Sequence, residues 1–349
     1  MAERIVYLDV AKLIGLVLVC FCHIPLPEGN FHIWAYSFHM PLFFILSGMF
    51  FRAERFVWSK SVFQLLVPFV LYNVLAWGIA VGIGYVSTHH LSLPHMSLTG
   101  LLMSNYIVGP SWFLLSLFMI RGFTYMVWQF SVRVFDKSVM KDLVIISVPV
   151  GLLLVYILTE NWGGWQVLSL RSTILGWLFY LFGYFAKDYI LQFVQAKKRI
   201  WLILVLVSLL VSFFSISNGQ VGIHCGEYGN HLLLFFFFGI AGTAGILGLS
   251  RLIKLPTIIL DTFMQGALFY ICMHTLMFEY MLLVWNKLTG DFSGNTLPEK
   301  VIVTLLTFVV SYPVILFLLR YFSLLLGKTK KQSYEYFSTN IKAVKVGKT

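Results

Sequence analysis

Three ionisable side chains lie in the first apolar stretch of the chain, at spacings that place them on one face of a helix. Asp9, Lys12 and His23 all fall within residues 5–24. A helix from Lys12 to His23 turns about 20° beyond three full turns and rises about 16 Å. Asp9 lies one turn before Lys12, so a purely structural ion pair is an alternative for these two. The cation suits an anionic group, and the imidazole suits proton transfer.

A second apolar stretch, residues 34–51, carries His39 in its first half. If the two stretches form antiparallel helices, His39 lies at a depth similar to that of His23, and the two imidazoles can meet. Ser47 and Gly48 form a small pair in the same stretch, which favours close packing between helices. Three cations follow this stretch: Arg52, Arg55 and Lys60. They suit phosphate binding, but they also fit the charge bias of cytoplasmic loops.

Three later side chains are candidates for binding a substrate: Trp112, His274 and Glu279. Trp112 begins an apolar stretch, where an aromatic ring is typical of a membrane interface or can stack on a sugar. His274 and Glu279 lie on different faces of another stretch, and each lines a cavity or has a structural role. A further cluster comprises His89, His90 and His95. Without a Cys or carboxylate beside it, this cluster predicts a solvated loop, and we expect no metal site.

The composition places these residues in a lipid environment. Of 349 residues, 59% are hydrophobic and 11% are charged, with a mean hydropathy of +0.86. Average soluble domains are about 45–50% apolar and about 25% charged. The values exclude a soluble, disordered or disulfide-stapled chain. The net charge of +11 fits the basic cytoplasmic loops of a membrane protein, so we expect no nucleic-acid partner.

Hydropathy predicts an all-α polytopic membrane protein with about ten transmembrane helices. The ten segments are 5–24, 34–51, 61–86, 111–130, 143–158, 173–190, 200–217, 231–250, 258–285 and 300–326. The ninth is long, so a tilt or a break is expected there. We assign residues 1–326 to one transmembrane domain and residues 327–349 to a basic cytoplasmic tail.

The basic residues predict the orientation of the bundle. With the N-terminus inside, 19 Lys and Arg fall on the inner side, three fall outside and three lie within spans. This bias predicts that both termini are cytoplasmic. The basic cluster at residues 328–331 is expected to stop transfer and to contact anionic lipid.

Several segments resemble one known family. The strings YLDVAKLIGLVLVCFCH and FHMPLFFILSGMFFR closely resemble the opening of the membrane-bound acyltransferase-3 family, the polysaccharide O-acetylases. The first-helix signature of that family is an Arg or Lys, ten residues and a His, which Lys12 and His23 match. Residues 109–118, 228–250 and 268–279 are also similar to it. One position departs from the pattern of the family. Gln64 stands where similar proteins often carry a basic residue, so other cations would have to supply the missing positive charge.

The resemblance implies transfer of an acyl group, preferably acetyl, from a cytoplasmic coenzyme A thioester to a hydroxyl of an extracytoplasmic glycan or lipid-linked sugar. Lys12, Arg52, Arg55 and Lys60 would then bind the donor. His23 would accept the proton of the hydroxyl, and His39 would orient His23 or the acceptor. Because a thioester is already activated, direct transfer and an acyl-histidine intermediate are both open. The expected location is the cytoplasmic (inner) membrane of a bacterium, as a multi-pass protein in contact with membrane lipid.

Two other classes of function are alternatives. A transporter or flippase of glycan precursors also needs a polar central path, but it turns over no thioester. No internal repeat is visible in the sequence, which disfavours the transporter. A non-catalytic scaffold subunit would tolerate the loss of His23.

The predicted orientation can be tested by cysteine labelling. In a background without the four native cysteines, Lys330→Cys should resist an impermeant maleimide in intact cells and react after lysis, because the basic side faces the cytoplasm. A cysteine introduced into the loop His89–Pro94 should react in both conditions. Modification of Lys330→Cys from outside would overturn the orientation.

Overall fold

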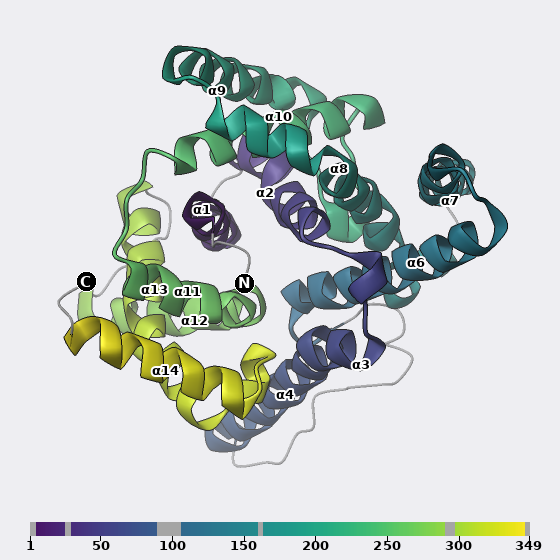
Figure 1. Ribbon diagram of the computed structural model, residues 1–349. Coiled ribbons are helices and arrows are strands. Elements are labelled where there is room, and N and C mark those ends of the chain that lie inside the picture. Colours follow the sequence, from purple (N-terminus) through teal and green to yellow (C-terminus); the bar gives the residue numbers. More distant parts are fainter. Residues whose placement is uncertain (1–4, 25–28, 89–105, 160–162, 290–296, 346–349) are drawn as a thin grey trace.

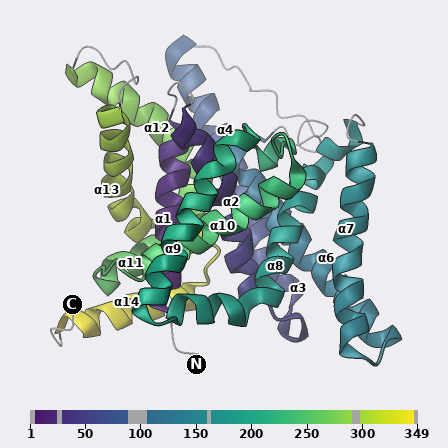
Figure 2. The ribbon, with the colours of Figure 1, turned by 90° about the horizontal axis from the view of Figure 1, so that it is seen from above.

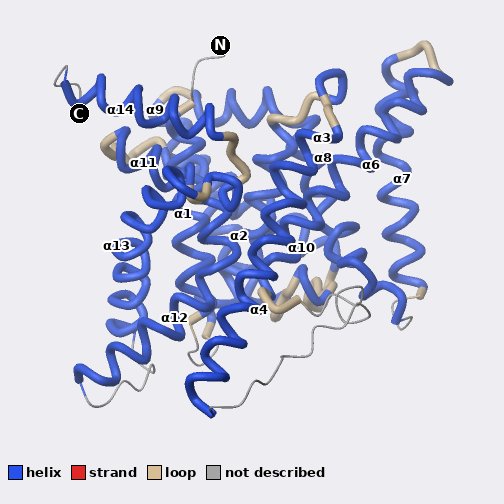
Figure 3. Tube along the Cα trace, turned by 90° about the horizontal axis from the view of Figure 1, so that it is seen from below, coloured by secondary structure: helices blue, strands red, loops and turns tan. Residues whose placement is uncertain are grey.

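The computed structural model describes residues 5–24, 29–88, 106–159, 163–289 and 297–345. Within these ranges every regular element is a helix, and one antiparallel bridge joins Gly222 to Glu227. The tube trace in Figure 3 shows long helices with short loops gathered at the two ends of the bundle. The protein is therefore an all-α polytopic membrane protein, as the sequence predicts.

The α-helices follow one another with short connections. They are α1 (Val6–His23), α2 (Asn30–Met49), α3 (Trp58–Ser61), α4 (Val67–Thr88), α6 (Trp112–Val134), α7 (Ser138–Leu158), α8 (Leu170–Gln195), α9 (Lys198–Phe213), α10 (Leu232–Ser250), α11 (Thr257–Gln265), α12 (Ala267–Thr289), α13 (Leu297–Tyr321) and α14 (Lys330–Lys345). Short 3-10 turns join them: η1 (Ala53–Arg55), η3 (Gly109–Ser111), η4 (Gly163–Ser169), η5 (Phe214–Asn218), η6 (Ile223–Cys225) and η7 (Ser323–Leu326). A π-helical turn, η2 (Val62–Leu66), leads into α4.

Eight helices in the described part of the chain are long and apolar enough to cross a membrane. They coincide with eight of the ten predicted segments. The other two segments correspond to α2 and α12. The polar side chains of Asn30, His32 and His39 reduce the hydropathy of α2, and the apolar helix at the start of α12 is shorter, spanning Ala267–Leu282. Both helices carry buried histidines, which are described below.

The predicted ninth segment is broken into two helices. α11 ends at Gln265, and α12 starts after Gly266. A β-carbon on Gly266 would lie 2.3 Å from Ile315 Cδ1 of α13, so the break lies where the Ile315 side chain packs against the backbone. Of the two expected outcomes, a tilt or a break, the structure shows the break.

The helices that matter most for the site lie at the centre of the bundle. Figure 1 shows α1 and α2 there, with α8, α9 and α10 on one side and α11, α12 and α13 on the other. In Figure 2, α14 runs across the helix ends, at the same end of the bundle as the start of α1 and α3. We call this end the α14 end. Residues 330–345 of the expected basic tail thus form an amphipathic helix at this end of the bundle.

The position of α2 depends on a close contact with α8. A β-carbon on Gly48 would lie 1.9 Å from the backbone oxygen of Tyr180, and one on Gly183 would lie 2.0 Å from that of Ile45. The small pair predicted to pack helices therefore acts through Gly48, which meets the α8 backbone. Ser47, its neighbour, lines a cavity instead.

We expect Gly48→Ala to destabilise the protein by about 1–3 kcal/mol, because the added carbon forces α2 and α8 apart. The measurement is thermal unfolding in detergent. Gly151→Ala is the matched control, since Gly151 lies within α7 with nothing near its β-carbon position; there alanine improves helix propensity. Equal melting temperatures for both variants would contradict the assigned contact.

Candidate functional site

Four histidines from four separate elements meet in a small chamber near the end of the bundle opposite α14. His23 ends α1, His39 lies in α2, His274 lies in α12 and His224 lies in η6. The ring centroids of His23 and His274 are 4.7 Å apart, and those of His23 and His39 are 6.4 Å apart. The chamber has a volume of about 40 Å³. We call it the histidine chamber; the expected meeting of His23 and His39 occurs there.

Backbone hydrogen bonds fix the tautomers of the three helical histidines. Each Nδ1 lies close to the carbonyl oxygen four residues earlier: 2.8 Å for His23, 2.9 Å for His39 and 2.6 Å for His274. A carbonyl oxygen only accepts hydrogen bonds, so each Nδ1 must carry the proton that it donates. The neutral rings therefore have their lone pair on Nε2. All three helical histidines are arranged to act as bases through the same atom.

The three rings differ in exposure and in partners. His39 and His274 are fully buried, whereas His23 is partly exposed. Nε2 of His274 is buried without a hydrogen-bond partner among the described residues. Nε2 of His23 lies 3.4 Å from the Tyr36 hydroxyl. Because Nε2 is the acceptor, the Tyr36 hydroxyl donates this long hydrogen bond, and His23 combines a weakly held base position with access to the chamber.

The segment around η6 forms one wall of the histidine chamber. The His224 carbonyl accepts hydrogen bonds from Arg171 Nε (3.3 Å) and Ser172 Oγ (3.2 Å). Tyr156 donates to the carbonyl of Gly226 at 3.0 Å. Gly226 has a φ of +77°, and a β-carbon there would lie 2.3 Å from the Tyr156 hydroxyl. These contacts hold the His224 ring over the chamber.

Trp112 and His224 form the aromatic part of this wall. Their ring centroids are 6.3 Å apart with an interplanar angle of 30°. Burial lowers the pKa of His224, which favours the neutral ring. Two flat faces with little charge suit stacking against a sugar ring. Sequence analysis selected Trp112 but missed His224, because only the folding of the loop brings it to the chamber.

A second cavity lies at the α14 end of the bundle and has a volume of about 480 Å³. Its walls come from α1, α2, η1, α3, η2, α6 and α12 and from the turns between them, and none of the lining residues is acidic. Five basic side chains line it: Lys12, Arg52, Arg55, Lys60 and Arg121. We call it the cationic cavity. It contains all four cations that the sequence analysis selected.

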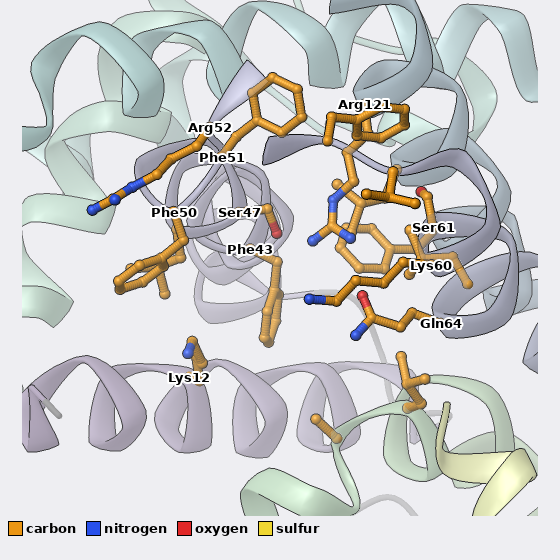
Figure 4. A pocket seen from close by; sticks show the side chains of 18 of the residues that line it. Lys12, Phe43, Ser47, Phe50, Phe51, Arg52, Lys60, Ser61, Gln64 and Arg121 are labelled. Carbon is orange, nitrogen blue, oxygen red and sulfur yellow. The ribbon is translucent and has the colours of Figure 1, made fainter. Parts of the chain in front are cut away.

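The basic side chains do not all point to the same place. Figure 4 shows that Lys60, Gln64 and Arg121 point toward a common part of the cavity, whereas Arg52 extends away from it. Arg121, from α6, was not selected from the sequence, although a cation inside a span is a signal of function. In Figure 4, Lys60 lies between Arg121 and Gln64, so two cations lie on the same side of the cavity as Gln64, where similar proteins often carry a basic residue.

Lys12 is paired as well as exposed to the cavity. Its Nζ lies 3.1 Å from Asp9 Oδ1. Asp9 does not line the cavity, so its carboxylate pairs with the Lys12 ammonium from outside the cavity. The structural role expected for Asp9 and the binding role expected for Lys12 are therefore compatible.

The two cavities meet at one side chain. Ile271 of α12 lines both of them, and His274 lies one helical turn further along. On α2, Phe43 lines the cationic cavity, and Met40, three residues earlier, lines the histidine chamber. Apolar side chains therefore separate the two cavities where they approach each other.

Two sets of predicted residues lie elsewhere. Glu279 is exposed on α12 and lines neither cavity, because it lies on a different face of the helix from His274. The cluster His89, His90 and His95 lies outside the described residues. Among the residues that the structure describes, no group of three His, Cys, Asp or Glu side chains is placed to hold a metal ion.

Comparison with known proteins gives one match. A family model described as an acyltransferase domain, that of acyltransferase family 3, matches residues 5–318. The match runs from the start of α1 almost to the end of α13, so it includes every residue that lines either cavity. Comparison with curated proteins and with solved structures gives no significant match.

Proposed function

The chain belongs to the acyltransferase-3 family and is an acyltransferase, and from this premise we propose its substrates. The donor is a cytoplasmic acyl-CoA, with acetyl as the acyl group. The acceptor is a hydroxyl of an extracytoplasmic glycan or lipid-linked saccharide. The enzyme works from the cytoplasmic membrane of a bacterium, with the α14 end facing the cytoplasm.

The observation that carries this proposal is the meeting of a cationic cavity and a histidine chamber at Ile271. Coenzyme A has phosphates at one end and a thiol at the end of a long flexible arm. Five cations without a lining acidic residue suit the phosphates. Lys12 and His23 are about 16 Å apart along α1, a separation that an extended pantetheine arm can bridge. The thioester would thus reach the histidines while the nucleotide stays in the cationic cavity.

The transfer needs one base and no protein nucleophile. In the direct route, the acceptor hydroxyl attacks the thioester carbonyl, and Nε2 of His23 accepts the hydroxyl proton. The new C–O bond forms, the C–S bond breaks, and the proton passes from His23 to the leaving thiolate. The base is then neutral again. The vacant Nε2 of His274 can accept a second hydrogen bond from the acceptor and so orient it.

The neighbouring imidazoles also favour a single proton in the chamber. With ring centroids 4.7 Å apart for His23 and His274, two protonated rings would repel each other at low dielectric. The chamber therefore accepts one proton and must release it before the next transfer. A direct route meets this condition, since the leaving thiolate takes the proton.

The grouping of side chains favours an acyltransferase over the transporter alternative. A flippase turns over no thioester, so it does not need a group of imidazole bases beside a cationic cavity. A scaffold subunit does not need three histidines with the same tautomer. Turnover of acyl-CoA in vesicles separates these alternatives from an acyltransferase with the proposed substrates.

We expect His23→Ala to reduce glycan acylation about 10²- to 10⁴-fold, the usual cost of losing a general base. The measurement is acetyl transfer in proteoliposomes, with binding of coenzyme A measured in parallel and expected to be unchanged. His39→Ala and His274→Ala should have smaller effects. His231→Ala is the control, because His231 is exposed and lines neither cavity. Substantial turnover by His23→Ala together with an inactive His39→Ala would move the base to α2.

We expect Arg121→Gln and Lys12→Ala to weaken coenzyme A binding about 10- to 150-fold, because each removes a charge-assisted phosphate contact worth roughly 1.5–3 kcal/mol. Transfer at saturating donor should change less. Calorimetric titration with coenzyme A measures the effect. Arg133→Gln is the matched control, since Arg133 is exposed on the same helix as Arg121 and lines neither cavity. Unchanged affinity in Lys12→Ala would leave Lys12 as a structural partner of Asp9 only.

A further inference from the structure

A third cavity lies on the side of the bundle at the α14 end, between α4, η7 and the first residue of α14. It has a volume of about 650 Å³. Apolar side chains form most of it, among them Leu71 and Leu75 of α4 and Leu325 of η7. Lys328 and Lys330 line the same cavity. We call it the lateral cleft; neither the cationic cavity nor the histidine chamber shares a residue with it.

The apolar part of the lateral cleft faces outward. Val74, Leu75 and Leu324 line it and are 49%, 40% and 46% exposed. Helix α4 is one of the spans, so these side chains lie where hydrocarbon surrounds the protein. A chain of methylene groups fits this surface better than water does.

The polar part of the lateral cleft carries one sign of charge. No acidic residue is among those that line it. The Lys328 side chain is half-buried, and burial lowers its pKa, with the nearby charge of Lys12 as a second cause. Lys328 also lines a neighbouring cavity, together with Asp261 and Glu335. On the side of the lateral cleft, the charged lining residues are lysines alone, which favours the binding of an anion there.

The backbone fixes the position of this ammonium. Gly327 has a φ of +62°, and a β-carbon there would lie 2.7 Å from the carbonyl oxygen of Gln64 in η2. The Lys328 N–H donates to the Ser323 carbonyl at 3.0 Å. The turn between η7 and α14 is therefore held against η2, and Lys328 is directed to one place.

A second cleft adjoins the first and extends its charge. It has a volume of about 590 Å³ and shares Tyr321, Ser323 and Lys330 with the lateral cleft. Its further lining includes Arg320 and the aromatic ring of Phe337. The two clefts thus lie on either side of Tyr321, with the shared Lys330 between them. A ligand with one anionic head and two apolar chains matches this arrangement.

We propose that the lateral cleft and its neighbour bind one anionic phospholipid, with the phosphate at Lys328 and Lys330 and the acyl chains in the two clefts. The family match ends at residue 318, so both lysines lie beyond it. The site is separate from acyl transfer, and the proposal does not depend on the identity of donor or acceptor.

The test compares lipids and variants of the full-length protein in detergent. Native mass spectrometry and thermal unfolding are measured with phosphatidylglycerol and with phosphatidylcholine of the same acyl chains. Phosphatidylglycerol should bind more tightly and raise the melting temperature more. Lys328→Gln with Lys330→Gln should weaken phosphatidylglycerol binding about 30-fold, from the usual contribution of two basic residues near anionic lipid. Lys331→Gln with Lys254→Gln removes the same charge from exposed positions outside both clefts and should have little effect.

A second pair of variants tests the apolar part of the site. Leu75→Trp fills the lateral cleft and should weaken phosphatidylglycerol binding, whereas Val70→Trp, on an exposed part of the same helix that does not line the cleft, should not. An unchanged melting temperature without added lipid shows that each variant is folded.

Three outcomes would overturn the proposal. Equal binding of the two lipids would remove the role of the cations. Equal competition by glycerol phosphate would make the site a phosphate site rather than a lipid site. Loss of binding in the lysine variants with no effect of Leu75→Trp would indicate adsorption to a charged surface only.

Discussion

The site depends on the hydrogen bond that each helical histidine donates to the carbonyl oxygen four residues before it. Inside a bilayer every polar group needs a partner within the protein. His23, His39 and His274 satisfy Nδ1 on their own helices, so no neighbouring side chain is needed to orient them. The same bonds leave the Nε2 atoms as acceptors in the chamber. Three helices can therefore bring basic nitrogens together without burying a charge.

Positive charge and imidazoles are kept at different depths of the same bundle. Gly48 and Gly183 let the backbones of α2 and α8 approach closely. The resulting position of α2 places His39 at one depth and the following Arg52 at another. Helix α1 repeats this division with Lys12 and His23. Because nearby cations would make an imidazole a weaker base, the separation leaves the imidazoles able to accept a proton while the cations remain available for an anionic ligand.

Local periodicity predicted much of this arrangement from the sequence. The shared face of Lys12 and His23 follows from helix geometry alone, and the similar depth of His39 follows from two consecutive antiparallel spans. Arg121 and His224 could not be found in this way, because their places depend on how α6 packs beside η2 and how the η6 segment folds back over the chamber. The roles of these residues in catalysis and binding stay predictions, as do the donor, the acceptor and the orientation.

The unequal sizes of the two cavities bear on how an acyltransferase of the proposed kind would avoid hydrolysis of its donor. A thioester reacts with water as well as with a sugar hydroxyl, so selectivity requires that the reacting carbonyl meets few water molecules. The cationic cavity of about 480 Å³ has room for phosphates together with water, whereas the histidine chamber of about 40 Å³ has room for very few water molecules. Ile271 separates them. Under the proposed function, the thioester leaves bulk water on passing Ile271, and an acceptor hydroxyl that displaces the remaining waters becomes the nucleophile nearest His23.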